Sequence, residues 1–416
     1  MPQQLQSHKP VLLVFPFNVM AHYLRCIQLA KYLQPYFHIQ FLHSDQYNAF
    51  VAQAGYGTFA CATLNAEKVQ QCVASFDFTW LNENDLTYLY NAQVKIINEL
   101  GASAVLGDMS PTLKMAAEKT GVFHLSLLNG YLSSYYQYVR RVPRSFHLYK
   151  FVNALPKTLA NYFTTMGEQI SFHDIHRPFS KIRKRAGLTA KYSYLQELEG
   201  DVVLLCDLPD IFPQKDLPSN YYFIPPLYYQ NEDGNNELIK NLDPSKKTLY
   251  VSMGSTGNWN NVSFLNNSDY HHYNIITAGD RNNIIRGSNV FSYSFVNNAK
   301  LFDITDLVIC HGGNGTTYQA LSYGIPLLCK TTHLEQEYNV DGLQRLQLGK
   351  SLNDFKDDQE YMEVTRQWVE RKGSLQFNTI KDKIAGSTEG FSQIMAEIMQ
   401  KEYLHKKGVL LVEALP

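Results

Sequence analysis

Short apolar segments alternate with helical patterns along most of this 416-residue chain. Val11–Phe15 is apolar at every position, and the residues after it carry apolar side chains at helical spacing. Similar apolar runs recur at residues 104–107, 122–128, 248–252 and 307–310. A strand that is apolar on both faces must be covered on both faces, so the pattern predicts parallel sheets flanked by helices, the α/β class.

The length favours two domains, because single cores rarely grow to this size. Residues 230–236 are polar and suit a linker, so we predict an N-terminal domain over 1–228 and a C-terminal domain over 229–416. The alternation breaks at about 131–191, which predicts a helical insertion rich in basic and aromatic residues.

The segment Cys310–Pro326 combines the end of a strand, a glycine-rich turn and the start of a helix. Such a turn leaves backbone N–H groups at a positively polarised helix N-terminus, where a phosphate can bind. We therefore predict a phosphate-binding loop to which His311 and Thr316 add side-chain donors.

The same segment resembles the donor-sugar signature of nucleotide-sugar-dependent glycosyltransferases of the UDP-glycosyltransferase type. The matching positions are His311, Gly315, Thr316, Gly324, Pro326, Glu335 and Gln336. The resemblance implies a GT-B protein: two Rossmann-like domains that face each other across a cleft. An ordinary Rossmann turn with a structural histidine is the alternative.

Inverting sugar transfer requires a base that deprotonates the acceptor hydroxyl. In the resembling family this base is a histidine after the first strand, a position that His22 occupies here, although Ala21 and Arg25 replace the family's glycine and proline. Asp108 matches the carboxylate that orients the base. Alternatively, His22 has no chemical role and Asp108 caps the helix that begins near Pro111.

On the donor side, the resemblance implies that a glycine-rich turn and the histidine loop contact the diphosphate, while Val296 lies beside the nucleotide base. The predicted diphosphate residues are Gly254, Ser255, His311, Gly313, Gly315 and Thr316. Gln319 stands where the family often has a ribose-binding glutamate. An amide has one acceptor oxygen where a carboxylate has two, so the ribose contact should be weaker, which argues against a preference for UDP and makes a dTDP-sugar a more plausible donor.

Glu335 and Gln336 match the pair that binds the hydroxyls of the donor sugar. A helix-opening role for Glu335, beside the helix dipole, is the alternative. The sequence has no Asp-x-Asp motif and no metal-spaced His/Cys cluster. We therefore expect metal-independent transfer with no cofactor, the nucleotide-sugar being a co-substrate.

Between residues 140 and 191 there are eleven Lys or Arg and two acidic residues, interleaved with aromatic residues. Basic and aromatic side chains together can hold a helix at an anionic membrane surface, or they can form a solvated face over a core. In the resembling family this region surrounds the acceptor, which suggests a small-molecule, apolar or lipid acceptor. No nucleic-acid-reading motif accompanies the patch.

The formal net charge of -1 gives no argument for a nucleic-acid partner. The six cysteines are scattered without C-x-x-C spacing, and no signal-like or membrane-spanning apolar stretch is present. We therefore predict a cytoplasmic protein, with peripheral membrane contact through 140–191 as an option.

Together these features predict an inverting glycosyltransferase that moves a sugar from a UDP- or dTDP-sugar to an acceptor hydroxyl. Two alternatives of other classes stay open. One is a catalytically silent relative that acts as an accessory or nucleotide-binding subunit. The other is a nucleotide-sugar epimerase or hydrolase on the same architecture.

Overall fold

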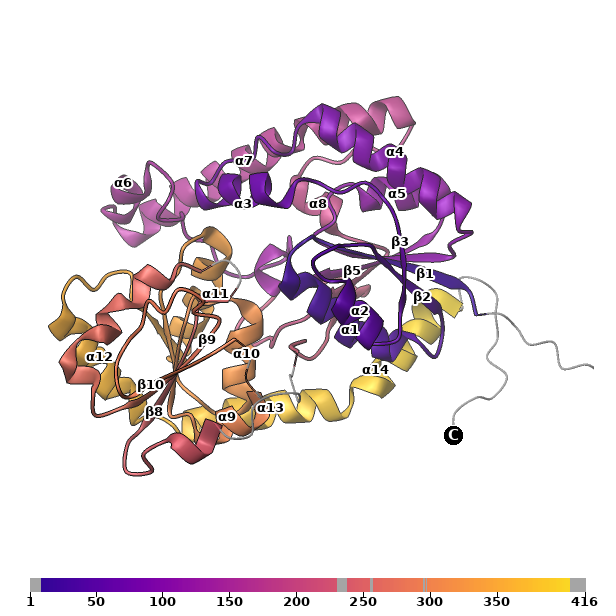
Figure 1. Cartoon of the computed structure of the whole chain (residues 1–416). Helices are drawn as coiled ribbons and strands as arrows, with labels where there is room; N and C mark the ends of the chain where they lie inside the picture. Colours follow the sequence, from indigo (N-terminus) through magenta and orange to yellow (C-terminus); the bar gives the residue numbers. More distant parts are fainter. Residues whose placement is uncertain (1–8, 230–237, 255–256, 295, 297, 405–416) are drawn as a thin grey trace, which may run out of the picture. The chain divides into compact units, whose positions relative to one another are not determined.

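The computed structural model describes residues 9–229, 238–254, 257–294, 296 and 298–404 (Figure 1). The chain divides into two compact units. Unit 1 contains the described residues up to 142, 146–225 and those from 389 on, and unit 2 contains 143–145 and the described residues of 226–388.

Unit 1 is built on a parallel sheet with the strand order β3-β2-β1-β4-β5-β6-β7. Its strands are β1 (Val11–Pro16), β2 (His38–Leu42), β3 (Gly57–Phe59), β4 (Ala104–Asp108), β5 (Phe123–Leu128), β6 (Val202–Leu205) and β7 (Tyr221–Phe223). Its helices are α1 (Met20–Leu33), α2 (Asn48–Gln53), α3 (Ala66–Ala74), α4 (Glu83–Glu99), α5 (Leu113–Thr120), η1 (Gly130–Leu132), α6 (Tyr149–Asn153), α7 (Lys157–Ala186), α8 (Tyr194–Leu198), α14 (Phe391–Ile398) and η5 (Met399–Leu404).

Unit 2 is built on a second parallel sheet with the order β10-β9-β8-β11-β12-β13. Its strands are β8 (Thr248–Ser252), β9 (Asn274–Ala278), β10 (Val290–Tyr293), β11 (Leu307–Cys310), β12 (Leu327–Cys329) and β13 (Gly349–Ser351). Its helices are η2 (Leu238–Asn241), η3 (Trp259–Asn266), η4 (Ser268–Tyr270), α9 (Asn298–Ile304), α10 (Asn314–Ser322), α11 (Leu334–Arg345), α12 (Asp358–Val369) and α13 (Leu375–Glu389).

Two parallel sheets flanked by helices confirm the predicted α/β class with two Rossmann-like domains. The apolar runs predicted as strands are β1, β4, β5, β8 and β11. The sequence did not reveal β10, in which no residue is fully buried, or the three-residue strands β3, β7 and β13. Short or half-exposed strands lack a long apolar run, so periodicity does not detect them.

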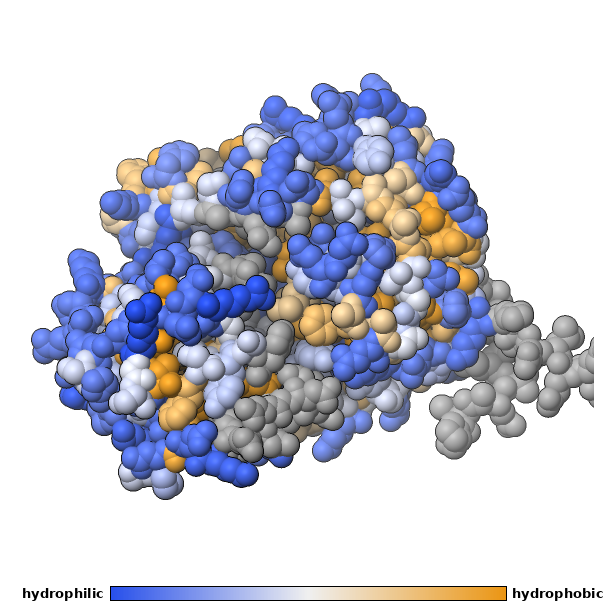
Figure 2. All heavy atoms as spheres, viewed as in Figure 1, coloured by the Kyte–Doolittle hydropathy of each residue, from blue (hydrophilic) through white to orange (hydrophobic). Residues whose placement is uncertain are grey.

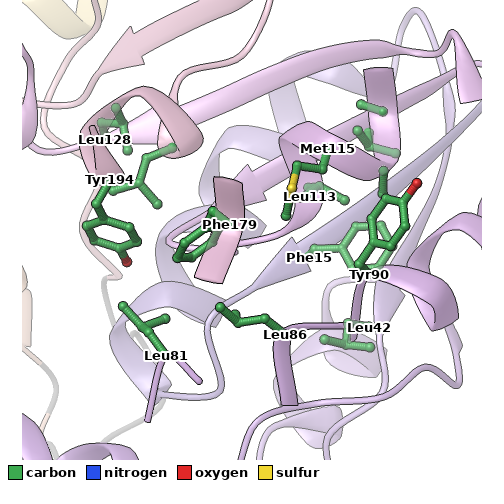
Figure 3. Close-up of a cluster of buried hydrophobic side chains, with 14 of the residues drawn as sticks. Phe15, Leu42, Leu81, Leu86, Tyr90, Leu113, Met115, Leu128, Phe179 and Tyr194 are labelled. Carbon is green, nitrogen blue, oxygen red and sulfur yellow. The ribbon is translucent and has the colours of Figure 1, made fainter. Parts of the chain in front are cut away.

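The core of unit 1 joins the sheet to the helices that cover it (Figure 3). Phe15 of β1 and Leu113 of α5 lie in one cluster with Leu86 of α4. Phe179, from the second half of α7, is fully buried in the same cluster. The predicted insertion is therefore anchored to the core through the C-terminal half of α7.

The C-terminal segment differs from the predicted domain division. Residues 389–404 were assigned to the second domain, but the structure groups them with unit 1. The ring of Phe391 packs on Tyr32 of α1 at 4.3 Å between centroids, and Tyr403 packs on Phe37 and Phe123 at 4.9 and 5.2 Å. Because the two residues of each contact are far apart in the sequence, no local pattern could predict these contacts.

We expect Phe391→Ala to lower the free energy of unfolding of unit 1 by about 3–5 kcal/mol, because it removes a ring that is buried against α1. Chemical denaturation monitored by fluorescence measures the change. Leu375→Ala is the matched control, since this side chain is 83% exposed and should change stability by less than about 0.5 kcal/mol. Equal effects of the two substitutions would contradict the packing of α14 on unit 1.

Candidate active site

His22 and Asp108 meet at the carboxyl edge of the first sheet. Strands β1 and β4 pair in parallel with Pro16 opposite Asp108, so the chain leaves both strands at the same edge. Helix α1 begins four residues after β1 and carries His22 in its first turn. The two atoms His22 Nδ1 and Asp108 Oδ1 are 2.8 Å apart. Asp108 does not cap α5, whose N-cap residue is Thr112.

Arg25, the residue that stands in place of the family's proline, is buried beside this pair. Its Nε donates to Asp108 Oδ2 at 2.5 Å and its second terminal nitrogen donates to Oδ1. The other terminal nitrogen donates to Asn129 Oδ1 at 2.7 Å. The sequence did contain a signal for this pairing: Arg25 is a charged residue among the apolar positions of α1. A buried guanidinium needs a carboxylate partner, so its position indicates an ion pair.

The electrostatics of the site follow from this pairing. Burial alone would raise the pKa of Asp108, but the positive charge of Arg25 and the contact with His22 lower it to about 2. Asp108 is therefore ionised at neutral pH. Since His22 Nδ1 lies 3.2 Å from Arg25 but 2.8 Å from the carboxylate, we assign its proton to the bond with Asp108, which leaves Nε2 as the basic nitrogen.

The predicted phosphate loop of unit 2 forms as expected between β11 and α10. Cys310 lies opposite Ser252 in the paired strands β11 and β8, so the turns that follow them are adjacent. His311 lies between Gly254 and Gly313 so closely that a side chain at either glycine would collide with its ring. At Gly254, which has φ +57°, an added Cβ would lie 2.5 Å from His311 Cε1. The two glycines therefore make room for the imidazole.

His311 is a neutral donor in this loop. Burial, aided by the nearby His333, lowers the pKa of His311 to about 4. Its Nδ1 is buried and has no hydrogen-bond partner among the described residues, as is also true of Thr317 Oγ1 and His333 Nδ1. Unpartnered buried polar atoms are costly, so their presence near the start of α10 favours a ligand there. Gly313 is the N-cap of α10, without a side-chain cap.

The other predicted donor residues lie around the same loop. Thr316 is in the first turn of α10, and an added Cβ at Gly315 would meet no atom within 4 Å. Gln319 is buried and its Nε2 donates to the Tyr229 carbonyl at 3.3 Å. Val296, which follows β10 and precedes α9 in the sequence, is buried. Ser255 lies outside the described residues.

Glu335 and Gln336 open helix α11, which is tied to the glycine turn by a bond from Asn339 Nδ2 to the Gly312 carbonyl. Gln336 is buried, and its Oε1 accepts from Thr332 N at 2.7 Å and from Thr332 Oγ1 at 3.0 Å. Gln336 therefore stabilises the loop before α11. The sequence did not indicate this structural role. Glu335 is half-buried in the first turn.

Among the residues that the structure describes, no group of three or more His, Cys, Asp or Glu side chains could hold a metal ion. Among the same residues, no helix has the length and apolar character needed to span a membrane.

No family model matches the chain. It is 23% identical over 355 residues to a PGL/p-HBAD biosynthesis glycosyltransferase of Mycobacterium tuberculosis, with 84% of this chain and 82% of the relative covered. A PGL/p-HBAD biosynthesis rhamnosyltransferase of Mycobacterium bovis is 24% identical over 354 residues, covering 84% and 78%. A relative from the same species named as inactive is 22% identical over 271 residues, covering 64% and 72%.

Solved structures resemble the whole fold. The calicheamicin glycosyltransferase CalG4 gives a TM-score of 0.69 at 13% identity, with 95% of this chain and 99% of that chain covered. The spinosyn rhamnosyltransferase SpnG complexed with thymidine diphosphate gives 0.66 at 15% identity, covering 94% and 100%. In sequence and in fold the chain is thus similar to GT-B glycosyltransferases, and the prediction of a glycosyltransferase of the UDP-glycosyltransferase type is confirmed.

Proposed function

We propose that this protein is an inverting glycosyltransferase that moves a sugar from a UDP- or dTDP-sugar to a hydroxyl group of a small-molecule acceptor, including apolar or lipid acceptors. The observation that carries the proposal is the contact between His22 and the buried, ionised Asp108. A histidine held by a carboxylate through one ring nitrogen can act as a base through the other.

In this reaction His22 Nε2 accepts the proton of the acceptor hydroxyl as its oxygen attacks the anomeric carbon. The bond between that carbon and the diphosphate oxygen breaks, and its electron pair leaves with the nucleotide diphosphate. Attack from the face opposite the leaving group inverts the anomeric centre. Asp108 keeps its hydrogen bond to His22 Nδ1 and so holds the imidazolium that forms in its orientation.

The leaving diphosphate must be stabilised by the glycine loop of unit 2. The start of α10 offers backbone N–H groups and the positive end of a helix dipole, and His311 adds a neutral side-chain donor. Gly313, Gly315 and Thr316 line this loop. Because these donors can stabilise the diphosphate, we propose that transfer needs neither a metal ion nor a further cofactor. A cytoplasmic location remains our prediction.

The choice between the two nucleotides depends on Gln319. Its amide nitrogen donates to a backbone carbonyl, and a single amide oxygen can accept from a ribose. The similarity to a named rhamnosyltransferase and to a structure with thymidine diphosphate adds support for dTDP-sugars.

A catalytically silent protein is the second candidate. It is favoured by two observations: a relative is named as inactive, and Arg25 neutralises the carboxylate that should assist His22. Donor turnover without an acceptor would instead favour an epimerase or hydrolase.

Calorimetric titration with UDP, dTDP and GDP tests the donor proposal. We expect dTDP or UDP to bind, and His311→Ala to weaken that binding by about tenfold or more, since one hydrogen bond to a charged group is worth about 1.5–3 kcal/mol. Gln319→Glu should shift the preference from dTDP toward UDP. Absence of binding to all three nucleotides would contradict the proposal.

His22→Gln tests the reaction itself. We expect the rate of sugar transfer to fall by about 10²–10⁴-fold, because general-base catalysis is lost, while nucleotide affinity stays within about twofold. A radiolabelled donor with a panel of apolar acceptor alcohols provides the measurement. Transfer at the wild-type rate would exclude His22 as the base, whereas absence of transfer by the wild type would favour one of the other two candidates.

Arg25 is a positioning residue in this proposal, because it binds both oxygens of Asp108 and so fixes the carboxylate against His22. We expect Arg25→Ala to lower kcat for transfer with little change in the donor KM, and millimolar guanidinium to restore part of kcat. Arg25→Lys should retain more activity, since it keeps the charge but loses the two-pronged geometry.

A fall in activity caused only by unfolding has a different signature. The Arg25→Ala variant would then lose its circular dichroism signal and thermal stability in parallel with kcat. Arg183→Ala is the matched control, because Arg183 is also buried and paired, with Glu118 and Glu197. Guanidinium should not raise kcat of the Arg183→Ala variant, because Arg183 does not bind Asp108 or His22.

A further inference from the structure

Exposed apolar side chains gather on one segment of unit 1. Eleven large hydrophobic residues are exposed among those the structure describes, and seven of them lie between residues 148 and 170. These seven, which we call the apolar face, are Leu148, Phe151, Leu159, Tyr162, Phe163, Met166 and Ile170, with exposures from 43% to 63%. Figure 2 includes apolar surface at the α6 end of this segment.

The apolar face follows helical spacing. Five of its residues are at 159, 162, 163, 166 and 170 of α7, so they form one stripe along the first half of that helix. The opposite side of the same turns is partly buried and carries small or polar residues, including Ala160 and Thr164. The helix therefore turns its polar side inward and its apolar side outward, the reverse of a helix that covers a core.

The second half of α7 is built the other way. Phe179 and Ile182 are buried in the core of unit 1, and Arg183 is buried in ion pairs with Glu118 and Glu197. This half fixes the helix to unit 1. The exposed first half is therefore not a consequence of loose packing of α7 as a whole.

The charges around the apolar face are positive. Glu168 is the only acidic residue between 146 and 172, and it pairs with Arg140. Lys150 and Lys157 are exposed beside the apolar side chains. The denser basic cluster farther along contributes less, because Arg177, Lys181, Arg183 and Arg185 are already in ion pairs.

We propose that α6 and the first half of α7 dock on the surface of a bilayer that contains anionic lipids. The aromatic and aliphatic side chains of the apolar face would enter the boundary between headgroups and acyl chains, while Lys150 and Lys157 contact lipid phosphates. Charge complementarity favours this occupant over a second copy of the chain, which would bring the same lysines against each other. The membrane contact that the sequence predicted for residues 140–191 is thereby assigned to residues 148–170.

Co-sedimentation with vesicles tests the docking. The vesicles contain phosphatidylcholine with about one third phosphatidylglycerol, and pure phosphatidylcholine vesicles are compared. The variant Leu159→Gln/Phe163→Gln/Ile170→Gln should lower the partition coefficient by about tenfold or more, because three apolar side chains no longer enter the membrane. Lys150→Gln/Lys157→Gln should lower it by about fivefold per lysine and weaken its dependence on salt.

Matched controls lie elsewhere on the chain. Tyr88→Gln and Leu375→Gln replace apolar side chains that are 70% and 83% exposed outside the apolar face, and should leave binding unchanged. Failure of the wild type to bind, or equal binding by the triple variant, overturns the proposal. A wild-type dimer that the triple variant converts to a monomer would assign the face to self-association instead. The assay needs no sugar transfer, so its outcome is independent of the proposed reaction.

Discussion

The carboxylate of Asp108 is the charge around which the edge of unit 1 is organised. It is fully buried, and an isolated buried anion would cost several kcal/mol, so its partners must come with it. Arg25 supplies both bonds that neutralise it and at the same time reaches Asn129, just after β5. One guanidinium thereby connects α1 to the ends of β4 and β5. The orientation of His22 depends on this connection, because the histidine binds the same carboxylate oxygen as Arg25.

The two units solve different electrostatic problems. Unit 1 holds a pair of opposite charges, Asp108 and Arg25, beside His22, which becomes positive in the proposed reaction. Unit 2 offers neutral donors: His311, whose pKa is lowered by burial, and the N–H groups at the start of α10. Backbone dipoles that are already in place need no rearrangement when negative charge develops on a leaving diphosphate. The glycines beside His311 leave room for its ring in this position, since a side chain at Gly254 would displace the ring.

The sequence predicted those features that depend on local pattern. The strands β1, β4, β8 and β11 are apolar runs, and the glycine turn after β11 was recognisable because only a tight turn requires such residues. The pairing of His22 with Asp108 was predicted from a resemblance and needed only the rule that ligand sites lie at the carboxyl ends of strands. Arg25 was missed because its partners are 83 and 104 residues away, and the packing of Phe391 on α1 was missed for the same reason. Gln336 was predicted to bind the donor sugar, and the structure shows that its side-chain oxygen accepts a hydrogen bond from Thr332 in the preceding loop.

Arg25 also bears on how strongly His22 can act. A lone carboxylate beside a histidine attracts the positive charge that proton transfer creates, but the Asp108–Arg25 pair is formally neutral, and Arg25 lies only 3.2 Å from His22 Nδ1. The attraction and the repulsion therefore largely offset each other, whereas the orienting hydrogen bond from Nδ1 to Asp108 is retained. A base built in this way gains more from orientation than from charge. The arginine thus connects the stability of the buried site to the strength of its proposed base.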